Sequence, residues 1–583
     1  MPKHLYSGNE AVARGAYEAG VKVCSAYPGT PSTEIFESLP QYEPALYCEW
    51  APNEKVALEV AYGASIANVR SMCAMKHVGL NVAADPMFTA AYNGVGAGFV
   101  IITADDPDMH SSQNEQDNRR YAEFAKIPML EPSDSLECQA FIKEAFEISE
   151  RFDVPVIFRM TTRLCHSKSL IELHEPIEIE SKPYSRNASK FVSTPANARR
   201  NHASLEKKLA DLEAFSNASP LNQEIDNPGA TIGVISSSVA FLYAQEAFGD
   251  KASYLKLGLT FPLPMDRIRQ FASRFERVIV IEELEPFMET AIRAAGIECE
   301  GKAMTGKIYE LNPQLVEQRV LGIQKPYVAC PIKLPARAPS LCPGCPHRGF
   351  FYALSQNADY VICGDIGCYT LGCAPPLNAM DSVVCMGGGF TLAHGMAKAF
   401  EMLGDKRHKV FGVLGDSTFF HSGLTGASEI IYNSSSVIPC ILDNRITGMT
   451  GQQDNPGTGR NLMGGSAPVL DIEAILRSMG YDKVLVVDPW KLDEVKAAIK
   501  EALDHEGHCA LIAKRPCLLI KGAPRTARRF AVDTQVCKAC RKCLKLGCGA
   551  ISMKEGKSSI DPVLCGGCSL CAQTCPFGAI KEA

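Results

Sequence analysis

Eight of the 24 cysteines in this chain lie within its last 47 residues, in two runs of closely spaced thiols. Three thiolates within seven residues suit three corners of an iron–sulfur cubane, whereas structural zinc is usually held by paired CxxC knuckles. The segment has little apolar sequence, so we expect it to fold around its metal. The runs are C-x₂-C-x₂-C-x₄-C at Cys537, Cys540, Cys543 and Cys548, and C-x₂-C-x₂-C-x₃-C-P at Cys565, Cys568, Cys571 and Cys575.

The second run has the spacing of bacterial two-cluster ferredoxins, in which the fourth cysteine of each run ligates the other cluster. This resemblance implies a small ferredoxin-like α+β domain with two [4Fe–4S] clusters over residues 530–583. The first run departs from the pattern by one extra residue and by Gly549 in place of proline. The implied ligand sets are Cys537, Cys540, Cys543 and Cys575 for one cluster, and Cys565, Cys568, Cys571 and Cys548 for the other.

The rest of the sequence is typical of a large globular protein. Its 583 residues, 46% of them hydrophobic, are enough for three or four domains. The net charge of −6 and the dispersed basic residues exclude a broad nucleic-acid footprint. The N-terminal residues lack the apolar core of a signal peptide. The sequence contains no run of about 18 apolar residues, the length needed to span a bilayer. We therefore expect a cytoplasmic protein with reduced thiols, and no membrane or nucleic-acid partner.

Two apolar runs with strand character, 410–414 and 437–442, each end on a polar pair, and 423–432 between them has helical character. This pattern predicts a βαβ unit, whose loops beyond the strand ends line a ligand crevice. Asp416 and Asn444 follow the two strands, 28 residues apart, and offer the oxygen ligands that a magnesium-bound diphosphate needs. An Asp in this position is also a common helix N-cap, so the pair alone leaves both interpretations open.

The spacing resembles the diphosphate motif of thiamine diphosphate (ThDP) enzymes. The resemblance implies that Asp416, Asn444 and the backbone carbonyl of Ile446 hold Mg²⁺, with Gly415 beside the cofactor. It predicts a diphosphate-binding domain over 333–525.

Near the N-terminus, helical and strand patterns alternate, which indicates an α/β fold. The segments YPGTPSTE at 27–34 and Asn-Glu-x-x-Ala at 53–57 resemble the pyrimidine-binding domain of the 2-oxoacid:ferredoxin oxidoreductases. The resemblance implies that Glu54 activates ThDP and that Thr30 contacts substrate or cofactor. A first-turn Glu also commonly just complements the helix dipole. His77, at a strand end, is a second-rank proton-handling candidate, although a lone His is more often structural.

These patterns predict several doubly wound parallel-sheet domains of the ThDP-binding type. The pyrimidine-binding domain is expected over 1–167. Residues 168–228 turn polar and irregular and are expected to be a linker with one helix. Residues 229–332 show a second α/β pattern, which resembles the transketolase C-terminal domain and is expected to act as a spacer.

A further CxxC lies in the segment CPGCPHR, at Cys342 and Cys345. Alone, it fits a zinc knuckle, a redox pair or half of an iron–sulfur site. Together with Cys368 and Cys517 it resembles the ligand set that 2-oxoacid oxidoreductases use for a cluster next to ThDP. This resemblance implies a third [4Fe–4S] cluster, with Cys363 and Cys373 as competing ligands.

The family reaction would be oxidative decarboxylation of a 2-oxoacid with coenzyme A, giving an acyl-CoA, CO₂ and reduced ferredoxin. Relatives that act on pyruvate carry Asn where this chain has Met449, which favours a larger substrate such as indolepyruvate or phenylpyruvate. The family also implies a smaller beta subunit and an α₂β₂ assembly. Two alternatives remain: a non-oxidative ThDP decarboxylase or carboligase, and an electron-carrying scaffold with a degenerate ThDP site.

Overall fold

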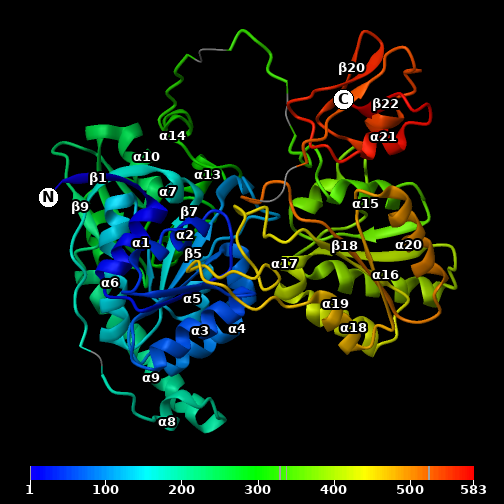
Figure 1. Ribbon diagram of the computed structural model, residues 1–583. Coiled ribbons are helices and arrows are strands. Elements are labelled where there is room, and N and C mark those ends of the chain that lie inside the picture. The colour runs from blue at the N-terminus through cyan, green and yellow to red at the C-terminus, as the bar shows by residue number, and fades with distance from the viewer. Residues whose placement is uncertain (1, 181, 327–329, 336–337, 523–525) are drawn as a thin grey trace. The chain divides into compact units, whose positions relative to one another are not determined.

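The structure is a computed structural model that describes residues 2–180, 182–326, 330–335, 338–522 and 526–583. The chain divides into two compact units, Met1–Pro331 and Ile332–Ala583. In Figure 1 the first unit runs from blue to green and the second from green to red. Each unit is described by itself below.

The first unit contains a seven-stranded sheet in the order β12-β6-β7-β5-β4-β2-β3 (Figure 1). All neighbouring strands pair in parallel except β12, which is antiparallel to β6. The central strands are buried along their whole length, as expected for a parallel sheet covered on both faces. The strands are β2 (Val23–Ala26), β3 (Tyr47–Trp50), β4 (Ser71–Lys76), β5 (Phe99–Asp105), β6 (Met129–Leu130), β7 (Val156–Thr161) and β12 (Leu259–Phe261). The helices are α1 (Gly8–Glu18), α2 (Thr33–Glu37), α3 (Glu54–Ile66), α4 (His77–Asn93), α5 (Arg119–Ala125), α6 (Ser135–Phe152) and α7 (Thr162–His166).

Residues 168–228, expected to be a linker with one helix, contain more regular structure than that. Strand β8 (Lys168–Glu172) pairs with β1 (Lys3–Ser7), so the segment begins as part of the N-terminal fold. The expected amphipathic helix is α9 (Pro195–Ala218), preceded by the short α8 (Ala188–Phe191). Strand β9 (Gln223–Ile225) then joins the next sheet.

The second sheet of this unit has the order β13-β10-β11-β9, with β9 antiparallel to the other three. Its strands are β10 (Ile232–Ser237), β11 (Ala252–Leu257) and β13 (Arg277–Ile281). Its helices are α10 (Ser238–Phe248), α11 (Met265–Ala272), α12 (Phe287–Ala294), α13 (Lys302–Thr305) and α14 (Pro313–Val320). Because β12 leaves this region to pair with β6, the stretch 229–332 also contributes to the first sheet.

The second unit is built on a five-stranded, fully parallel sheet in the order β14-β15-β16-β18-β17. The predicted βαβ unit is confirmed, because β15 and β16 are parallel neighbours joined by α17 and α18. The strands are β14 (Tyr360–Cys363), β15 (Lys409–Gly415), β16 (Ile438–Asp443), β17 (Lys483–Val487) and β18 (Cys509–Lys514). The helices are α15 (His347–Leu354), α16 (Gly388–Leu403), α17 (Asp416–Thr418), α18 (Leu424–Tyr432), α19 (Ile472–Met479) and α20 (Leu492–Asp504).

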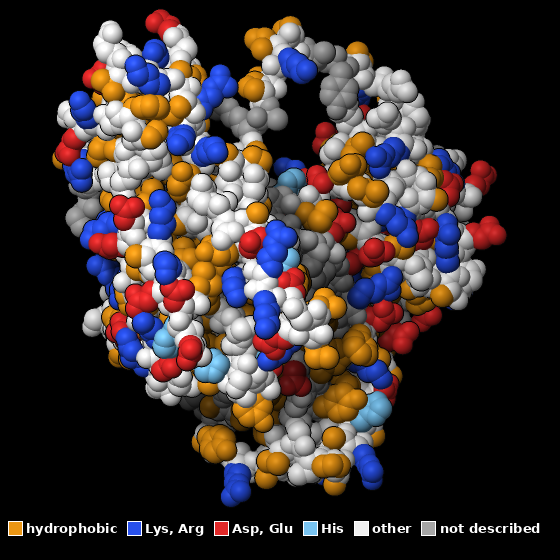
Figure 2. Space-filling view, turned by 90° about the vertical axis from the view of Figure 1, so that its right-hand side faces the viewer, with side chains coloured by type: hydrophobic (Ala, Val, Ile, Leu, Met, Phe, Trp, Pro, Cys, Tyr) orange, Lys and Arg blue, Asp and Glu red, His pale blue; other side chains and the backbone are white. Residues whose placement is uncertain are grey.

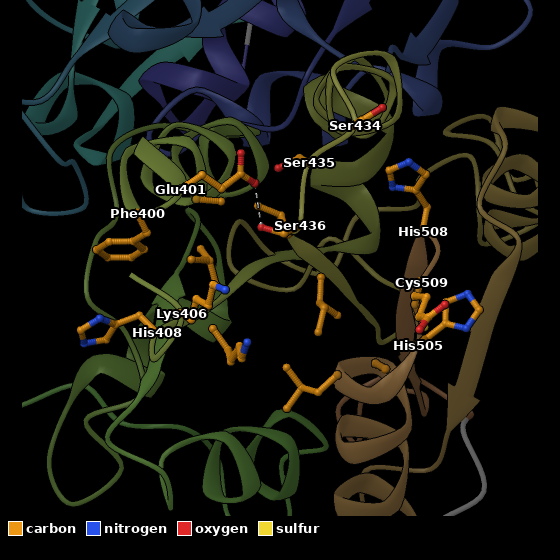
Figure 3. Close-up of a pocket in the computed structure, with 18 of the residues that line it drawn as sticks. Phe400, Glu401, Lys406, His408, Ser434, Ser435, Ser436, His505, His508 and Cys509 are labelled. Carbon is orange, nitrogen blue, oxygen red and sulfur yellow. Dashed lines mark hydrogen bonds between the residues drawn. The ribbon is translucent and has the colours of Figure 1, made fainter. Parts of the chain in front are cut away.

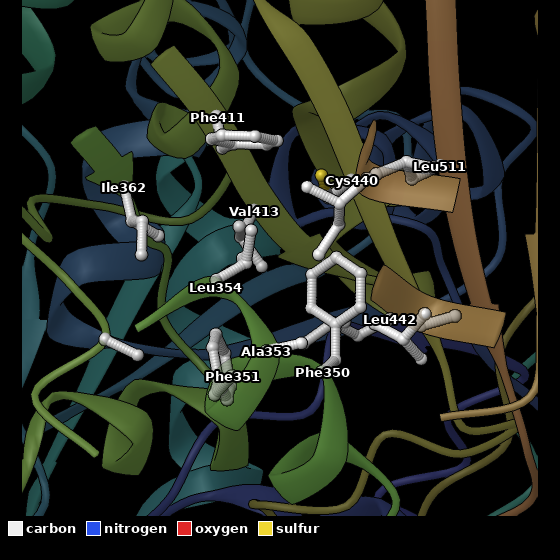
Figure 4. Close-up of a cluster of buried hydrophobic side chains, with 14 of the residues drawn as sticks. Phe350, Phe351, Ala353, Leu354, Ile362, Phe411, Val413, Cys440, Leu442 and Leu511 are labelled. Carbon is white, nitrogen blue, oxygen red and sulfur yellow. The ribbon is translucent and has the colours of Figure 1, made fainter. Parts of the chain in front are cut away.

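Helix α15 is anchored on this sheet by two buried aromatic side chains. Figure 4 shows Phe350 and Phe351 from the helix facing Phe411, Val413 and Leu442 from β15 and β16, in one buried cluster. This packing fixes the CPGCPHR segment, which leads into α15, against the sheet that carries Asp416 and Asn444.

The cysteine-rich segment folds as a small α+β domain. It has two antiparallel pairs, β19 (Phe530–Val532) with β22 (Ile580–Glu582) and β20 (Ile551–Lys554) with β21 (Lys557–Ile560). The short helices η6 (Lys542–Leu546) and α21 (Leu570–Thr574) lie at equivalent places in its two halves. Its hydrophobic core includes Leu492 from α20, so it packs on the parallel-sheet domain.

Charged side chains of both signs are interspersed over most of the face drawn in Figure 2. Of the helices in the described residues, none combines the length and the apolar character needed to cross a membrane.

Candidate cofactor and iron–sulfur sites

Asp416 and Asn444 meet at one edge of the parallel sheet of the second unit. Asp416 follows β15 and Asn444 follows β16, and the carboxyl ends of neighbouring parallel strands lie at the same edge. Both side chains are buried. The strand order therefore places both residues at the edge where the sequence predicts a ligand crevice.

The carboxyl group of Asp416 is buried without a cationic partner. Burial, reinforced by the charge of Asp443, raises the pKa of Asp416 to about 7. Its Oδ2 accepts a 3.0 Å hydrogen bond from Nδ2 of Asn455, and no basic side chain in the described ranges forms an ion pair with it. A cation beside this carboxyl group would favour its ionised form, so the residue fits a magnesium ligand.

The amide of Asn444 is held by two hydrogen bonds. Nδ2 donates to Nε2 of His347 at 3.2 Å, and Oδ1 accepts from the backbone amide of Ile446 at 3.3 Å. Burial lowers the pKa of His347 to about 4, so the ring is neutral and can accept this bond. Ile446 is itself buried, whereas Met449, three residues further on, is 49% exposed.

Gly415 has a packing reason to be glycine. A Cβ at this position would lie 2.6 Å from Cε1 of Tyr369, whose hydroxyl bonds to the Thr418 hydroxyl at 2.7 Å. The ring therefore covers the Cα of Gly415, and any side chain would displace it.

Asp365 is a third acidic residue at this edge and was missed by the sequence reasoning. It follows β14, and its Oδ2 accepts a 2.9 Å hydrogen bond from the amide of Gly389 in the first turn of α16. Burial raises its pKa to about 7. The signal was present, because Gly364-Asp365 repeats the Gly-Asp pattern that follows β15.

In the first unit, Glu54 is the first residue of α3 and is 5% exposed. Asn53 caps this helix by accepting a 2.9 Å bond from the amide of Val56. A Cβ on Gly79 would lie 2.6 Å from Oε1 of Glu54, so the glycine leaves room for the carboxyl group. Glu54 is therefore a buried acid in a site shaped for it, beyond what a dipole-complementing residue needs.

Thr30 and His77 follow the neighbouring strands β2 and β4. His77 is fully buried, its Nε2 lies 3.1 Å from the carbonyl of Asn114, and burial together with the charge of Lys76 lowers its pKa. Lys76, which the sequence did not single out, packs against the Gly29-Thr30 turn, because a Cβ on Gly29 would lie 3.0 Å from that of Lys76. The same sheet edge thus gathers Thr30, Glu54, Lys76 and His77.

The four inner cysteines, Cys342, Cys345, Cys368 and Cys517, are near enough for the charges of their thiols to interact. Burial raises the pKa of Cys345 to about 12 and of Cys368 to about 11, and the Cys342 and Cys517 thiols reinforce both shifts. Burial also raises the pKa of Cys517, with Cys342 and Asp416 contributing. The competing Cys363 instead lies with its sulfur 3.4 Å from that of Met396.

The eight cysteines of the tail line two cavities. A cavity of about 20 Å³ is lined by Cys548, Cys565, Cys568 and Cys571, and one of about 10 Å³ by Cys537, Cys540, Cys543 and Cys575. In each, the fourth thiol comes from the opposite run, as crossed ligation requires. Among the described residues, no group of three or more His, Cys, Asp or Glu side chains is placed to hold a metal ion. The assignment of clusters to the tail therefore rests on the spacing of its thiols.

A further cavity lies away from these groups. It measures about 600 Å³ and is lined by residues at the beginnings of β15, β16 and β18, together with His408, His505 and His508 (Figure 3). This is the edge of the sheet opposite to Asp416 and Asn444, so the cavity is not part of the predicted cofactor crevice.

Three segments of the chain match known protein families. Residues 14–211 match "Pyruvate flavodoxin/ferredoxin oxidoreductase, thiamine diP-bdg", residues 365–513 match "Thiamine pyrophosphate enzyme, C-terminal TPP binding domain", and residues 559–581 match "4Fe-4S binding domain". Fold and site together therefore define a ThDP-dependent oxidoreductase that carries iron–sulfur clusters and acts on a 2-oxoacid with ferredoxin as the redox partner.

Curated relatives indicate which family within this class of oxidoreductases the chain belongs to. The chain is 41% identical to indolepyruvate oxidoreductase subunit IorA of Methanothermobacter thermautotrophicus, over 98% of this chain and 96% of that protein. It is 39% identical to the Pyrococcus horikoshii IorA subunit, over 100% and 97%, and 41% identical to that of Archaeoglobus fulgidus, over 99% and 97%. The chain belongs to the family of indolepyruvate oxidoreductase IorA subunits, within the 2-oxoacid:ferredoxin oxidoreductases. The fold and the family resemblance stated from the sequence are confirmed.

Proposed function

We propose that the chain catalyses the oxidative decarboxylation of aryl pyruvates, such as indolepyruvate and phenylpyruvate, with coenzyme A. The products would be an aryl-acetyl-CoA, CO₂, one proton and two electrons, and the electrons would pass singly through iron–sulfur clusters to ferredoxin. One observation carries the proposal: the amide of Cys517 donates a 2.9 Å hydrogen bond to the carbonyl of Asn444. A candidate cluster ligand is thereby bonded directly to a candidate magnesium ligand.

In this proposal Asp416, Asn444 and the carbonyl of Ile446 would hold Mg²⁺, which would bind the diphosphate of ThDP. Bound ThDP supplies a carbon nucleophile that makes loss of CO₂ from a 2-oxoacid possible. Asn455 fixes the orientation of the Asp416 carboxylate through the bond at Oδ2, and His347 does the same for the Asn444 amide.

Glu54 would hold and exchange a proton with the pyrimidine ring, which requires a buried carboxyl group. Thr30 would contact substrate or cofactor, and His77 would serve as a second proton-handling group. Met449 would contact the aryl side chain, for which a flexible apolar residue is suited.

Electrons would leave through three [4Fe–4S] clusters. The set Cys342, Cys345, Cys368 and Cys517 lies next to the magnesium edge, and the two tail sets follow. Cys540 is exposed, and four exposed basic residues, none ion-paired within the described ranges, surround it in sequence. A basic face attracts an acidic partner, so we place the docking face for an acidic ferredoxin on Lys538, Arg541, Lys542 and Lys545.

The assembly would also contain the smaller beta subunit, in an α₂β₂ arrangement. A panel of 2-oxoacids, assayed anaerobically with this partner subunit, coenzyme A and a viologen dye, tests the function. Aryl pyruvates should reduce the dye fastest. Decarboxylation that leaves the dye oxidised would replace the proposal with a non-oxidative decarboxylase, and a protein that never retains ThDP would replace it with an electron-carrying scaffold.

Crossed ligation in the tail can be tested by iron counting on double variants. Cys537→Ser with Cys575→Ser changes one set only, so it should cost one cluster of about four irons. Cys537→Ser with Cys565→Ser changes both sets and should cost two. Under uncrossed ligation the first double variant would also lose two clusters.

A further inference from the structure

Arg348 ties the CPGCPHR segment to the cysteine-rich tail. It is the second residue of α15 and is 2% exposed. Its Nη1 donates to the carbonyl of Leu546 in η6 at 2.6 Å, and its Nη2 donates to the carbonyls of Leu341 and Cys342 at 2.5 and 3.1 Å. The guanidinium group thus lies between two cysteine-bearing loops of the second unit.

This buried charge has no carboxylate partner. None of the Asp and Glu residues in the described ranges forms an ion pair with Arg348, and its Nε has no hydrogen-bond partner. Arginine stays protonated in proteins, and a buried charge without a counter-charge is costly. Backbone carbonyls offset this cost only in part, so the working protein must supply negative charge nearby.

Two cysteine sets lie within electrostatic reach of the guanidinium. Arg348 lines the cavity formed by Cys548, Cys565, Cys568 and Cys571. The guanidinium also bonds the carbonyl of Cys342, which belongs to the inner set.

The two CxxC loops also touch through their glycines. A Cβ on Gly566, between Cys565 and Cys568, would lie 3.1 Å from the Cα of Gly344 and 3.0 Å from the carbonyl oxygen of Pro343. Gly344 has a φ of 76°, which favours glycine. The loops are therefore in backbone contact beside the shared arginine.

We propose that Arg348 is the common counter-charge of two iron–sulfur centres, one on Cys342, Cys345, Cys368 and Cys517 and the other on Cys548, Cys565, Cys568 and Cys571. The proposal rests on the cluster sites proposed above. A cubane with four thiolate ligands is anionic and becomes more so on reduction, so a fixed cation between two of them favours the reduced form of both. Reduction of either centre adds one electron and moves no proton, because Arg348 remains protonated throughout.

A purely structural role is the rival explanation, since the guanidinium also bonds three carbonyls. Arg348→Gln removes the charge, whereas Arg348→Lys keeps the charge and loses the fork of donors. We expect the glutamine variant to lower the reduction equilibrium constant of both centres about tenfold, which is about 59 mV for a one-electron couple. In the lysine variant, the reduction equilibrium constants of both centres should stay within about threefold of the wild-type values.

The measurement is a redox titration, followed by electron paramagnetic resonance, on the full enzyme loaded with iron and assembled with its partner subunit. Arg529→Gln is the matched control. That side chain also donates to backbone carbonyls, of Thr526 and Arg528, but it is exposed, so its removal should leave both potentials unchanged.

Iron is counted before each titration. Wild-type protein without the inner cluster would refute the proposed function, whereas fully loaded Arg348→Gln protein with unchanged potentials would overturn the present inference alone. Equal shifts in the glutamine and lysine variants would also overturn it, in favour of a structural role. If the glutamine variant does not retain iron, the lysine variant decides: wild-type potentials support the counter-charge, and lowered potentials despite the retained charge contradict it.

Discussion

The side-chain amide of Asn444 donates a 3.2 Å hydrogen bond to Nε2 of His347, joining the proposed magnesium edge to the CPGCPHR segment. Because the bond fixes the amide of a metal ligand, replacing His347 by Ala should weaken binding of ThDP with Mg²⁺ about tenfold. Equilibrium dialysis with labelled ThDP measures this. His408→Ala is the control, since that ring bonds Asp405 at the opposite edge of the sheet. Equal ThDP affinity in the two variants would contradict the prediction.

Binding of Mg²⁺ and ThDP should depend on pH through Asp416. Burial raises the pKa of this group to about 7 in the metal-free protein, so below that pH the ion must displace a proton. We expect the affinity for Mg²⁺ to fall about tenfold per pH unit below about pH 7. The same shift makes metal-free protein less stable as pH rises toward 7, because the unfolded chain then holds fewer protons than the folded one. Calorimetry at several pH values tests both trends. The Asp416→Asn substitution should abolish the loss of stability of the metal-free protein as pH rises.

Glu54 should matter for turnover more than for cofactor binding. Glu54→Gln keeps the shape of the side chain beside Gly79 but cannot exchange a proton, so we expect kcat to fall about 100-fold or more while ThDP is retained. Viologen reduction and ThDP content are the two measurements. Glu59→Gln changes an exposed carboxylate of the same helix and should leave both values unaltered. Full activity in Glu54→Gln protein would remove the residue from the mechanism.

The inner cysteines should hold about four irons per chain. Cys345→Ser should lose this amount of iron, because that thiol interacts with those of Cys342 and Cys517. Cys363→Ser and Cys373→Ser, the two competitors, are the matched controls and should retain all iron. Iron analysis of anaerobically purified protein provides the readout, and unchanged iron in Cys345→Ser protein would exclude the inner cluster.

Charge reversal beside Cys540 should weaken the interaction with ferredoxin without affecting chemistry. For Lys542→Glu combined with Lys545→Glu we expect the KM for ferredoxin to rise about tenfold and to depend less on salt, with viologen reduction unchanged. Lys496→Glu, an exposed lysine on α20, serves as control. An unaltered KM would place the docking face elsewhere.

Most of the features that could be predicted from the sequence are visible as local patterns of residues. The β15–β16 unit, with Asp416 and Asn444 at its ends, follows from apolar runs and polar termini less than 35 residues apart. The grouping of the tail thiols follows from a spacing rule. These features depend on neighbours in sequence, which a pattern can represent.

What escaped prediction depends on packing between distant segments. His347 and Asn444 are 97 residues apart, and they meet only because α15 is anchored on the sheet. Arg348 resembles any surface arginine in the sequence, and η6, 198 residues away, contributes to its burial. Strand β12 has only three residues, too few to show that it joins the first sheet.

The shared core of the second unit limits how the iron–sulfur tail can be recombined. Leu492 packs among Phe530, Leu546 and Leu570, and the Gln573 side chain bonds the backbone of Leu492 and Trp490 at 2.9 and 2.7 Å. An excised tail would therefore expose the apolar pocket that Leu492 fills, and the Gln573 side chain would lose its hydrogen-bond partners. Replacing the tail by a different electron carrier would require redesign of α20 as well. The cysteine-rich tail is a separate segment in the sequence, but its core is shared with the parallel-sheet domain.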